Sequence, residues 1–121
     1  MRGTALVVED DFLIATDMEA ELQRRDYPDV VCTGRVADAL EIVASRDVAV
    51  AVLDIDLGGG ATSAPVAREL RARGIPFVFV SGNAASILPP DLHDAPHMHK
   101  PVDWARFDEL MQTLAGAQSR L

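Results

Sequence analysis

Five short apolar runs, four of them followed at once by a charged or hydroxyl residue, are the feature that most constrains the fold. The runs are Ala5–Val8, Val30–Thr33, Val48–Leu53, Phe77–Val80 and Pro96–His99. Each has the length of a buried strand, and stretches with helical spacing of apolar residues separate them. This alternation is typical of an α/β protein with a parallel sheet. The run Val48–Leu53 is apolar on both faces, so we expect it to be the central strand.

Apolar residues between the strands predict four regular helices and one degraded helix. The inward positions of the regular helices are Ile14, Met18 and Leu22; Val36, Ala39, Leu40 and Val43; Val66, Ala67 and Leu70; and Trp104, Phe107, Met111 and Leu114. We expect Thr62 or Ser63 to cap the third helix and Asp103 to cap the last. Pro89-Pro90 forbids a continuous helix between the fourth and fifth strands, where at most about one turn fits around Ala84 to Leu88.

The composition fits one compact unit, and we predict a single domain over residues 1–121. The net charge of −8 argues against nonspecific binding to nucleic acid. No apolar stretch approaches the roughly 18 residues that span a bilayer, and the first strand begins too early to leave room for a signal peptide. Cys32, the single cysteine, lies in an apolar run, and we interpret it as a buried thiol in a cytoplasmic protein.

The residues at the strand ends point to one site. Glu9 and Asp10 follow the first strand, Asp54 the third, Ser81 the fourth and Lys100 the fifth. In an open parallel sheet, ligands bind outside the carboxyl ends of the strands, so these side chains should meet in one pocket. Clustered carboxylates repel each other unless a hard cation such as Mg²⁺ lies among them. A metal, a lysine and a hydroxyl around one nucleophilic aspartate predict phosphoryl transfer.

The same motifs, in this order and spacing, resemble the receiver domain of bacterial two-component response regulators. The stretches that carry the resemblance are Leu6–Asp11, Val52–Asp54, Val80–Gly82 and His99–Pro101. The resemblance covers essentially the whole chain. It implies a flavodoxin-like, doubly wound sheet of five parallel strands in the order 2-1-3-4-5, with helices on both faces. The fourth helix is expected to be short or irregular.

The resemblance also assigns roles around the acceptor. It implies that Asp54 is the phosphoacceptor and that the cofactor is Mg²⁺. Asp10 would bind the metal directly, Glu9 through a water molecule, and Asp56 through its backbone carbonyl. Whether the carboxylate of Asp56 also reaches a metal-bound water is left open by the sequence.

Ser81 and Lys100 are the remaining site residues that the resemblance implies. Ser81 would be the switch hydroxyl that bonds the aspartyl phosphate, and Lys100 would pair with a phosphoryl oxygen. The phosphoryl donor would be a sensor histidine kinase or phosphotransfer protein. The chain would signal to an unknown downstream protein through protein–protein contacts, or act as a phosphate sink or shuttle. It would catalyse only its own phosphoryl transfer and dephosphorylation.

A narrower resemblance is to the "FAT GUY" group of stand-alone receivers. It rests on the segments Pro76–Gly82 and Leu53–Gly59 and on the proline-broken fourth helical region. Gly58 stands where most receivers have a proline. His97 stands where most receivers have an aromatic residue that rotates inward on activation, so the aromatic switch is either an imidazole or absent.

Two other functions are compatible with parts of the pattern. Asp54-Ile55-Asp56 resembles the Asp-x-Asp motif of haloacid-dehalogenase-type phosphatases, but that reading leaves Glu9 and Asp10 unexplained. A pseudo-receiver that binds partners without phosphorylation would not need the complete set of acids, serine and lysine. The three histidines have no cysteine or carboxylate partners at ligand spacing, which disfavours a zinc site.

Overall fold

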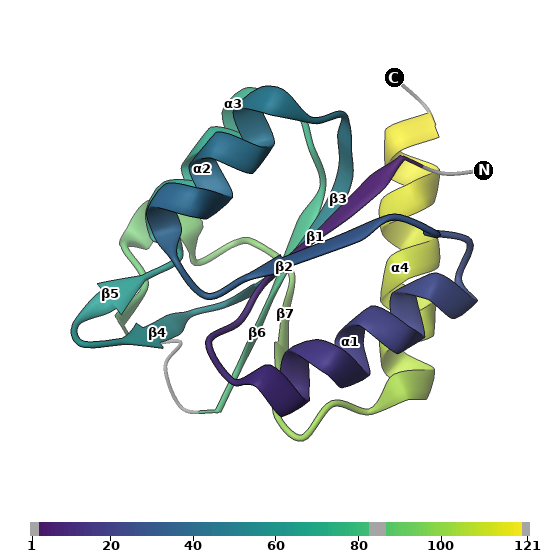
Figure 1. Cartoon of the computed structure of the whole chain (residues 1–121), viewed down its shortest axis with the longest axis horizontal. Helices are drawn as coiled ribbons and strands as arrows, with labels where there is room; N and C mark the ends of the chain where they lie inside the picture. The colour runs from purple at the N-terminus through teal and green to yellow at the C-terminus, as the bar shows by residue number, and fades with distance from the viewer. Residues whose placement is uncertain (1–2, 83–86, 120–121) are drawn as a thin grey trace.

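A five-stranded parallel sheet lies at the centre of the molecule, with helices on both faces (Figure 1). The computed structural model describes residues 3–82 and 87–119. The strands of this sheet are β1 (Thr4–Val8), β2 (Val30–Thr33), β3 (Val48–Asp54), β6 (Phe77–Ser81) and β7 (His97–His99). Their order is β2-β1-β3-β6-β7. This confirms the doubly wound sheet of order 2-1-3-4-5, with the third strand between β1 and β6 as its apolar sequence predicts.

The described helices are α1 (Phe12–Arg24), α2 (Val36–Ser45), α3 (Ala64–Ala72) and α4 (Trp104–Ser119). Asp11 caps α1 by accepting hydrogen bonds from the backbone N–H groups of Leu13 and Ile14. Asp103 caps α4 in the same way, as predicted. Ser63 is the N-cap residue of α3, but its buried hydroxyl makes no capping bond and has no partner among the described residues. None of the described helices is long and apolar enough to cross a membrane.

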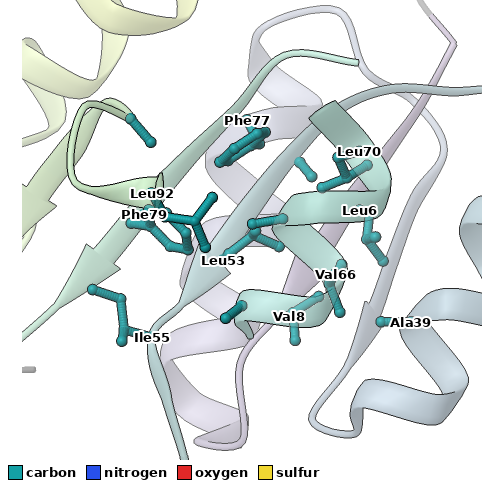
Figure 2. Packing of buried hydrophobic residues seen from close by; sticks show 14 of the residues in the cluster. Leu6, Val8, Ala39, Leu53, Ile55, Val66, Leu70, Phe77, Phe79 and Leu92 are labelled. Carbon is teal, nitrogen blue, oxygen red and sulfur yellow. The ribbon is translucent and has the colours of Figure 1, made fainter. Parts of the chain in front are cut away.

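Side chains alternate along each strand and divide the core into two apolar layers, one on each face of the sheet. Leu6 and Val8 of β1 belong to the layer under α2 and α3, together with Phe79 of β6 (Figure 2). Ala5 and Val7, one residue out of step, belong to the layer under α1 and α4. The sheet is therefore buried on both faces, and Asp54 and Ser81 lie at the carboxyl ends of β3 and β6.

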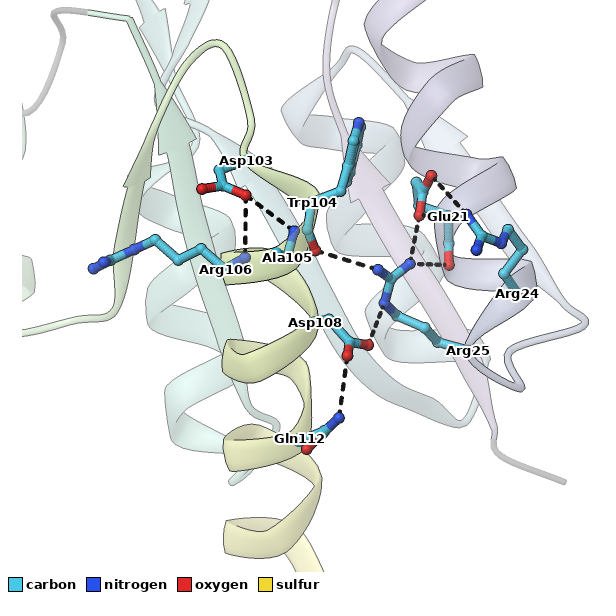
Figure 3. A network of polar contacts seen from close by, with 9 residues as sticks. All are labelled: Glu21, Arg24, Arg25, Asp103, Trp104, Ala105, Arg106, Asp108 and Gln112. Carbon is cyan, nitrogen blue, oxygen red and sulfur yellow. Dashed lines mark hydrogen bonds and ion pairs between the residues drawn. The ribbon is translucent and has the colours of Figure 1, made fainter.

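A polar network joins α1 to α4 at the edge of the second layer (Figure 3). The guanidinium group of Arg25 contacts Glu21 of its own helix at 2.7 Å and Asp108 of α4 at 3.0 Å. It also donates to the backbone carbonyl of Trp104 and lies over the ring of Phe107. This one side chain therefore fixes α1 against the helix that begins just after Lys100.

The segment after Asp54 forms a small hairpin, with Gly58–Gly60 at its turn. The hairpin consists of β4 (Asp56–Gly58) and β5 (Ala61–Thr62), which pair antiparallel. Gly59 and Gly60 connect them, both with positive φ. Two consecutive residues with positive φ allow a tight two-residue turn, which glycine adopts without steric cost.

The described residues between β6 and β7 contain no α-helix, and part of them packs on α3. Part of the predicted turn around Ala84 to Leu88 lies outside the described residues. Beyond it there is a short 3₁₀ helix, Pro90–Leu92, and Leu88, Leu92 and Ala95 are buried. Arg68 of α3 makes two hydrogen bonds to the carboxylate of Asp91. The irregular fourth helical region predicted from Pro89-Pro90 is thus anchored at its carboxyl-terminal half.

Cys32 is exposed, so the prediction of a buried thiol is wrong. It lies on β2, which is an edge strand of the sheet and is covered less completely than the inner strands. Partial burial, and then the charge and hydrogen bond of Glu19, together raise the pKa of the thiol to about 11. Such a thiol is protonated and unreactive at neutral pH.

Candidate functional site

Three carboxylates meet at the carboxyl edge of the sheet. One oxygen each of Glu9, Asp10 and Asp54 lies within 4.8 Å of the others. Val8 pairs with Leu53 in the sheet, so the residues that follow them, Glu9 and Asp54, are brought side by side. Glu9 and Asp54 are buried, whereas Asp10 is exposed. The arrangement is a buried acidic pocket with one open side, and its hard oxygen donors suit a divalent cation such as Mg²⁺.

Lys100 closes the pocket from the end of β7. Its Nζ lies 2.9 Å from Glu9 Oε2 and 3.4 Å from Asp54 Oδ2. The backbone N–H of Lys100 donates to the carbonyl of Ser81 at 2.8 Å, which fixes the lysine against the end of β6. The peptide bond between Lys100 and Pro101 is cis. Four of the predicted site residues, the three acids and the lysine, are therefore in one cluster.

The pocket holds more negative charge than Lys100 balances. Burial and then the charge of Glu9 raise the pKa of Asp54, and Lys100 lowers it, so that the net pKa is about 7. Burial lowers the pKa of Lys100, but its hydrogen bond and charge interaction with Glu9, and its contact with Asp54, bring the net pKa above the ordinary value. Asp54 is thus a carboxyl group that gains a proton easily unless further positive charge is supplied.

This pKa predicts that stability depends on pH when divalent cations are absent. Asp54 titrates at about 7 in the folded chain and near its ordinary value of 3.8 when unfolded. The folded state therefore binds more protons between these values, and the free energy of unfolding should fall by a few kcal/mol as pH rises from about 4 to 7. Denaturant unfolding at several pH values in a chelating buffer measures this. Asp54→Asn should lose most of the slope; an equal slope in both proteins would contradict the prediction.

Two glycines lie beside Asp10, and one of them, Gly34, leaves room for its backbone. A Cβ atom on Gly34 would lie 2.9 Å from Asp10 Cα and 3.3 Å from its Cβ. A Cβ atom on Gly58 would lie 3.5 Å from Asp10 Oδ2, and Gly58 has φ of 87°. Any side chain at position 34 would thus displace Asp10. The sequence marks Gly34 only as a turn after the second strand, and nothing in one sequence reveals its contact with the acidic pocket.

Asp56 is beside the pocket, but its carboxylate is not in the cluster of acids found among the described residues. Its Oδ1 accepts a hydrogen bond from the backbone N–H of Gly58 at 2.9 Å. The side chain therefore stabilises the start of the β4–β5 hairpin. One oxygen of this carboxylate is thus bound to its own turn, and a contact of the other oxygen with a metal-bound water stays a prediction.

Ser81 lies at the end of β6, and its hydroxyl contacts a histidine. Ser81 Oγ is 2.9 Å from His97 Nε2, and Ser81 itself is buried. His93 contacts the carbonyl of Leu88, and the ring of His99 lies against that of His97. Among the described residues the histidines join no group of potential metal ligands. The sequence singles out position 97, but the hydrogen bond to Ser81 could not be predicted from it.

Comparisons with known proteins place this geometry in a family. No protein-family model and no curated protein sequence matches the chain. The chain is similar to the solution structure of SdrG from Sphingomonas melonis Fr1, with 35% identity over 93% of this chain and 96% of that one, and a TM-score of 0.81.

Two further solved structures are similar. The BeF₃-activated conformation of SdrG from Pseudomonas melonis Fr1 has a TM-score of 0.75, with 35% identity over 93% of this chain and 95% of that one. A response regulator receiver protein from Sinorhizobium medicae WSM419 has the same fold, with 24% identity over 96% of each chain and a TM-score of 0.80. The acidic pocket with its lysine resembles a receiver metal site. The chain belongs to the response regulator receiver domain family of two-component systems.

Proposed function

We propose that Asp54 accepts a phosphoryl group, with Mg²⁺ as cofactor, from a sensor histidine kinase or a phosphotransfer protein. The observation that carries this proposal is the acidic pocket of Glu9, Asp10 and Asp54, closed by Lys100. A carboxylate can attack phosphorus only when the repulsion between the two anionic groups is offset. The raised pKa of Asp54 supports the proposal, because burial and the charge of Glu9 disfavour the ionised carboxylate unless positive charge is added.

The residues of the pocket divide the binding of the cation between them. Asp10 and Asp54 would be direct ligands, with the Asp56 carbonyl as a third. Both oxygens of Glu9 already accept hydrogen bonds, one from the Asp11 N–H at 3.0 Å and one from Lys100 at 2.9 Å. This supports an indirect role for Glu9, through a metal-bound water. Bound there, Mg²⁺ would neutralise charge on the phosphoryl oxygens.

Lys100 would stay in contact with the acceptor throughout the transfer. Its ammonium group lies 3.4 Å from Asp54 Oδ2 and is only partly exposed, so it can pair with a phosphoryl oxygen without a large movement. Ser81 is the last residue of β6, which pairs with the strand of Asp54, and would bond the phosphoryl group after transfer. These two side chains recognise the product and do not act as nucleophiles.

The surface beside the pocket suits a protein donor. Phe12 and Leu13, in the first turn of α1, are 80% and 73% exposed. Their backbone directly follows Asp10 and Asp11, so a partner that brings a phosphohistidine to Asp54 would cover them. The chain would then act by contact with a downstream protein, or as a phosphate sink or shuttle, in the cytoplasm. It would be no enzyme beyond its own transfer and dephosphorylation.

The contacts of the acidic residues also argue against the two other functions, the phosphatase and the pseudo-receiver. A phosphatase of the haloacid-dehalogenase type would use the carboxylates of Asp54 and Asp56 together, but the Asp56 carboxylate is bound to the N–H of Gly58. A pseudo-receiver has no need for a lysine held between Glu9 and Asp54. Membership of the FAT GUY group stays a prediction from sequence.

A labelled phosphodonor tests the proposal. Incubation of the chain with labelled acetyl phosphate or a phosphorylated histidine kinase, with Mg²⁺, should give one covalent label that is stable in acid and lost in alkali. Chelation of Mg²⁺ should prevent it. Release of phosphate from added phosphomonoesters without such a label would support the phosphatase instead, and absence of both activities would support the pseudo-receiver.

A further inference from the structure

Ser81 and His97 face each other on the same side of the sheet. Phe79 pairs with His97 and Ser81 with His99 in the β6–β7 register, so residues 79, 81, 97 and 99 share one face. This face of the sheet is covered by α2 and α3. The side chain of Asp54 belongs to the other face, because it alternates along β3 with the same spacing as Val50 and Val52, which pack in the opposite layer. The Ser81 hydroxyl thus starts from the His97 side of the sheet.

In the hydrogen bond between these two side chains, we consider the Ser81 hydroxyl as the donor and a ring nitrogen of His97 as the acceptor. Ser81 Oγ lies 2.9 Å from His97 Nε2, and a serine hydroxyl donates only one hydrogen bond. Burial, and then the charge of His99, lower the pKa of His97, which favours the neutral ring. A neutral imidazole has one nitrogen without a proton, and this nitrogen accepts a hydroxyl proton well.

A phosphoryl group on Asp54 requires the same proton. Its oxygens are acceptors without hydrogen atoms, so Ser81 can bond them only by donating. If Ser81 donates its one hydrogen bond to His97 Nε2, it cannot at the same time donate to a phosphoryl oxygen. We infer that His97 is a positioning residue that holds the Ser81 hydroxyl in the unphosphorylated chain, and that this bond must break when Ser81 binds the aspartyl phosphate. This inference rests on the proposed function. It adds to it a hydrogen bond that opposes the binding of Ser81 to the phosphoryl group.

The inference predicts that removing the His97 ring nitrogen favours the phosphorylated state. His97→Phe keeps a ring of similar size and cannot accept the proton. With Mg²⁺ present, it should bind beryllofluoride about threefold to tenfold more tightly than the native chain, the effect of one neutral hydrogen bond that no longer has to break. His99→Phe is the matched control, because it changes the neighbouring ring but not the Ser81 contact, and its affinity should equal the native one.

Two more measurements separate this role from a general effect on packing. In a Ser81→Ala background, His97→Phe should no longer change beryllofluoride affinity, since the competing bond is already absent. In the unsubstituted chain, ¹⁵N NMR of His97 should show Nε2 as a hydrogen-bonded acceptor, and its shift should change when Mg²⁺ and beryllofluoride are added. This NMR measurement needs no variant, so it tests the inference even if His97→Phe does not fold.

The outcomes distinguish the inference from the proposed function. Equal or weaker binding by His97→Phe, or an unchanged Nε2 shift on activation, would overturn the role of His97 and leave Asp54 as the acceptor. An effect of equal size in the Ser81→Ala background would also overturn it, because His97 would then act without Ser81. If the native chain binds no beryllofluoride at all, both the proposed function and this inference are wrong.

Discussion

Asp54→Asn is expected to abolish covalent labelling by a phosphodonor. The amide keeps the shape of the side chain and one oxygen, but it lacks the negative oxygen that attacks phosphorus. The structure offers no second carboxylate in the same position: Glu9 is held by Lys100 and the Asp11 N–H, and Asp10 is the more exposed member of the pocket. Labelled acetyl phosphate with Mg²⁺, followed by acid precipitation, measures the result.

Asp11→Asn is the matched control for this experiment. It makes the same chemical change one residue from the pocket, and asparagine is as good an N-cap as aspartate. Since the carboxylate of Asp11 accepts hydrogen bonds from the N–H groups at the start of α1, and its contact with Glu9 is made by the backbone, this variant should label like the native chain. Acid-stable label on Asp54→Asn would identify another acceptor and refute the assignment of Asp54.

Asp54→Asn should also make the chain more stable at neutral pH when no divalent cation is present. The native folded state must either keep a proton on Asp54 or accept repulsion from Glu9, and the amide avoids both. A variant that loses function while gaining stability is the behaviour expected of a site that is strained until its ligand binds. A loss of stability instead would show that the Lys100–Asp54 contact outweighs the repulsion.

The strands and the acidic pocket could be predicted because their signals are local. An apolar run followed by a polar residue places that residue at a strand end, and parallel strands bring their ends together. This reasoning identified Glu9, Asp10, Asp54 and Lys100, which the structure gathers in one cluster. The family resemblance added the strand order, which spacing alone does not determine.

The contacts that could not be predicted depend on exact placement. Gly34 is 24 residues from Asp10 in sequence, and the register of β1 with β2 brings it so close that a Cβ atom on it would meet the Cα of Asp10. The exposure of Cys32 follows from its edge strand, which its apolar neighbours do not reveal. The β4–β5 hairpin was missed because a run of glycines gives no strand signal.

The second large effect is expected at the metal site. Asp10→Asn should weaken Mg²⁺ binding by about 100-fold or more, because it removes the charge of a direct ligand. Glu9→Gln should weaken it by only about tenfold, since both Glu9 oxygens are already bonded to Lys100 and the Asp11 N–H. Trp104 lines the same groove as Lys100, so its fluorescence can report binding, with calorimetry as an independent measure.

The relative size of these two effects tests which of the two acids, Asp10 or Glu9, binds Mg²⁺ directly. If Glu9 were a direct ligand and Asp10 a solvated residue, Glu9→Gln would have the larger effect. The Glu9→Gln variant would then also free Lys100 to bind Asp54 more closely, and the closer ammonium group would lower the pKa of Asp54. Equal Mg²⁺ affinity in the native chain and in Asp10→Asn, with Asp11→Asn as the control, would remove Asp10 from the site. The close approach of Gly34 to Asp10 would then have no functional reason, whereas a large loss in Asp10→Asn explains why that position must lack a side chain.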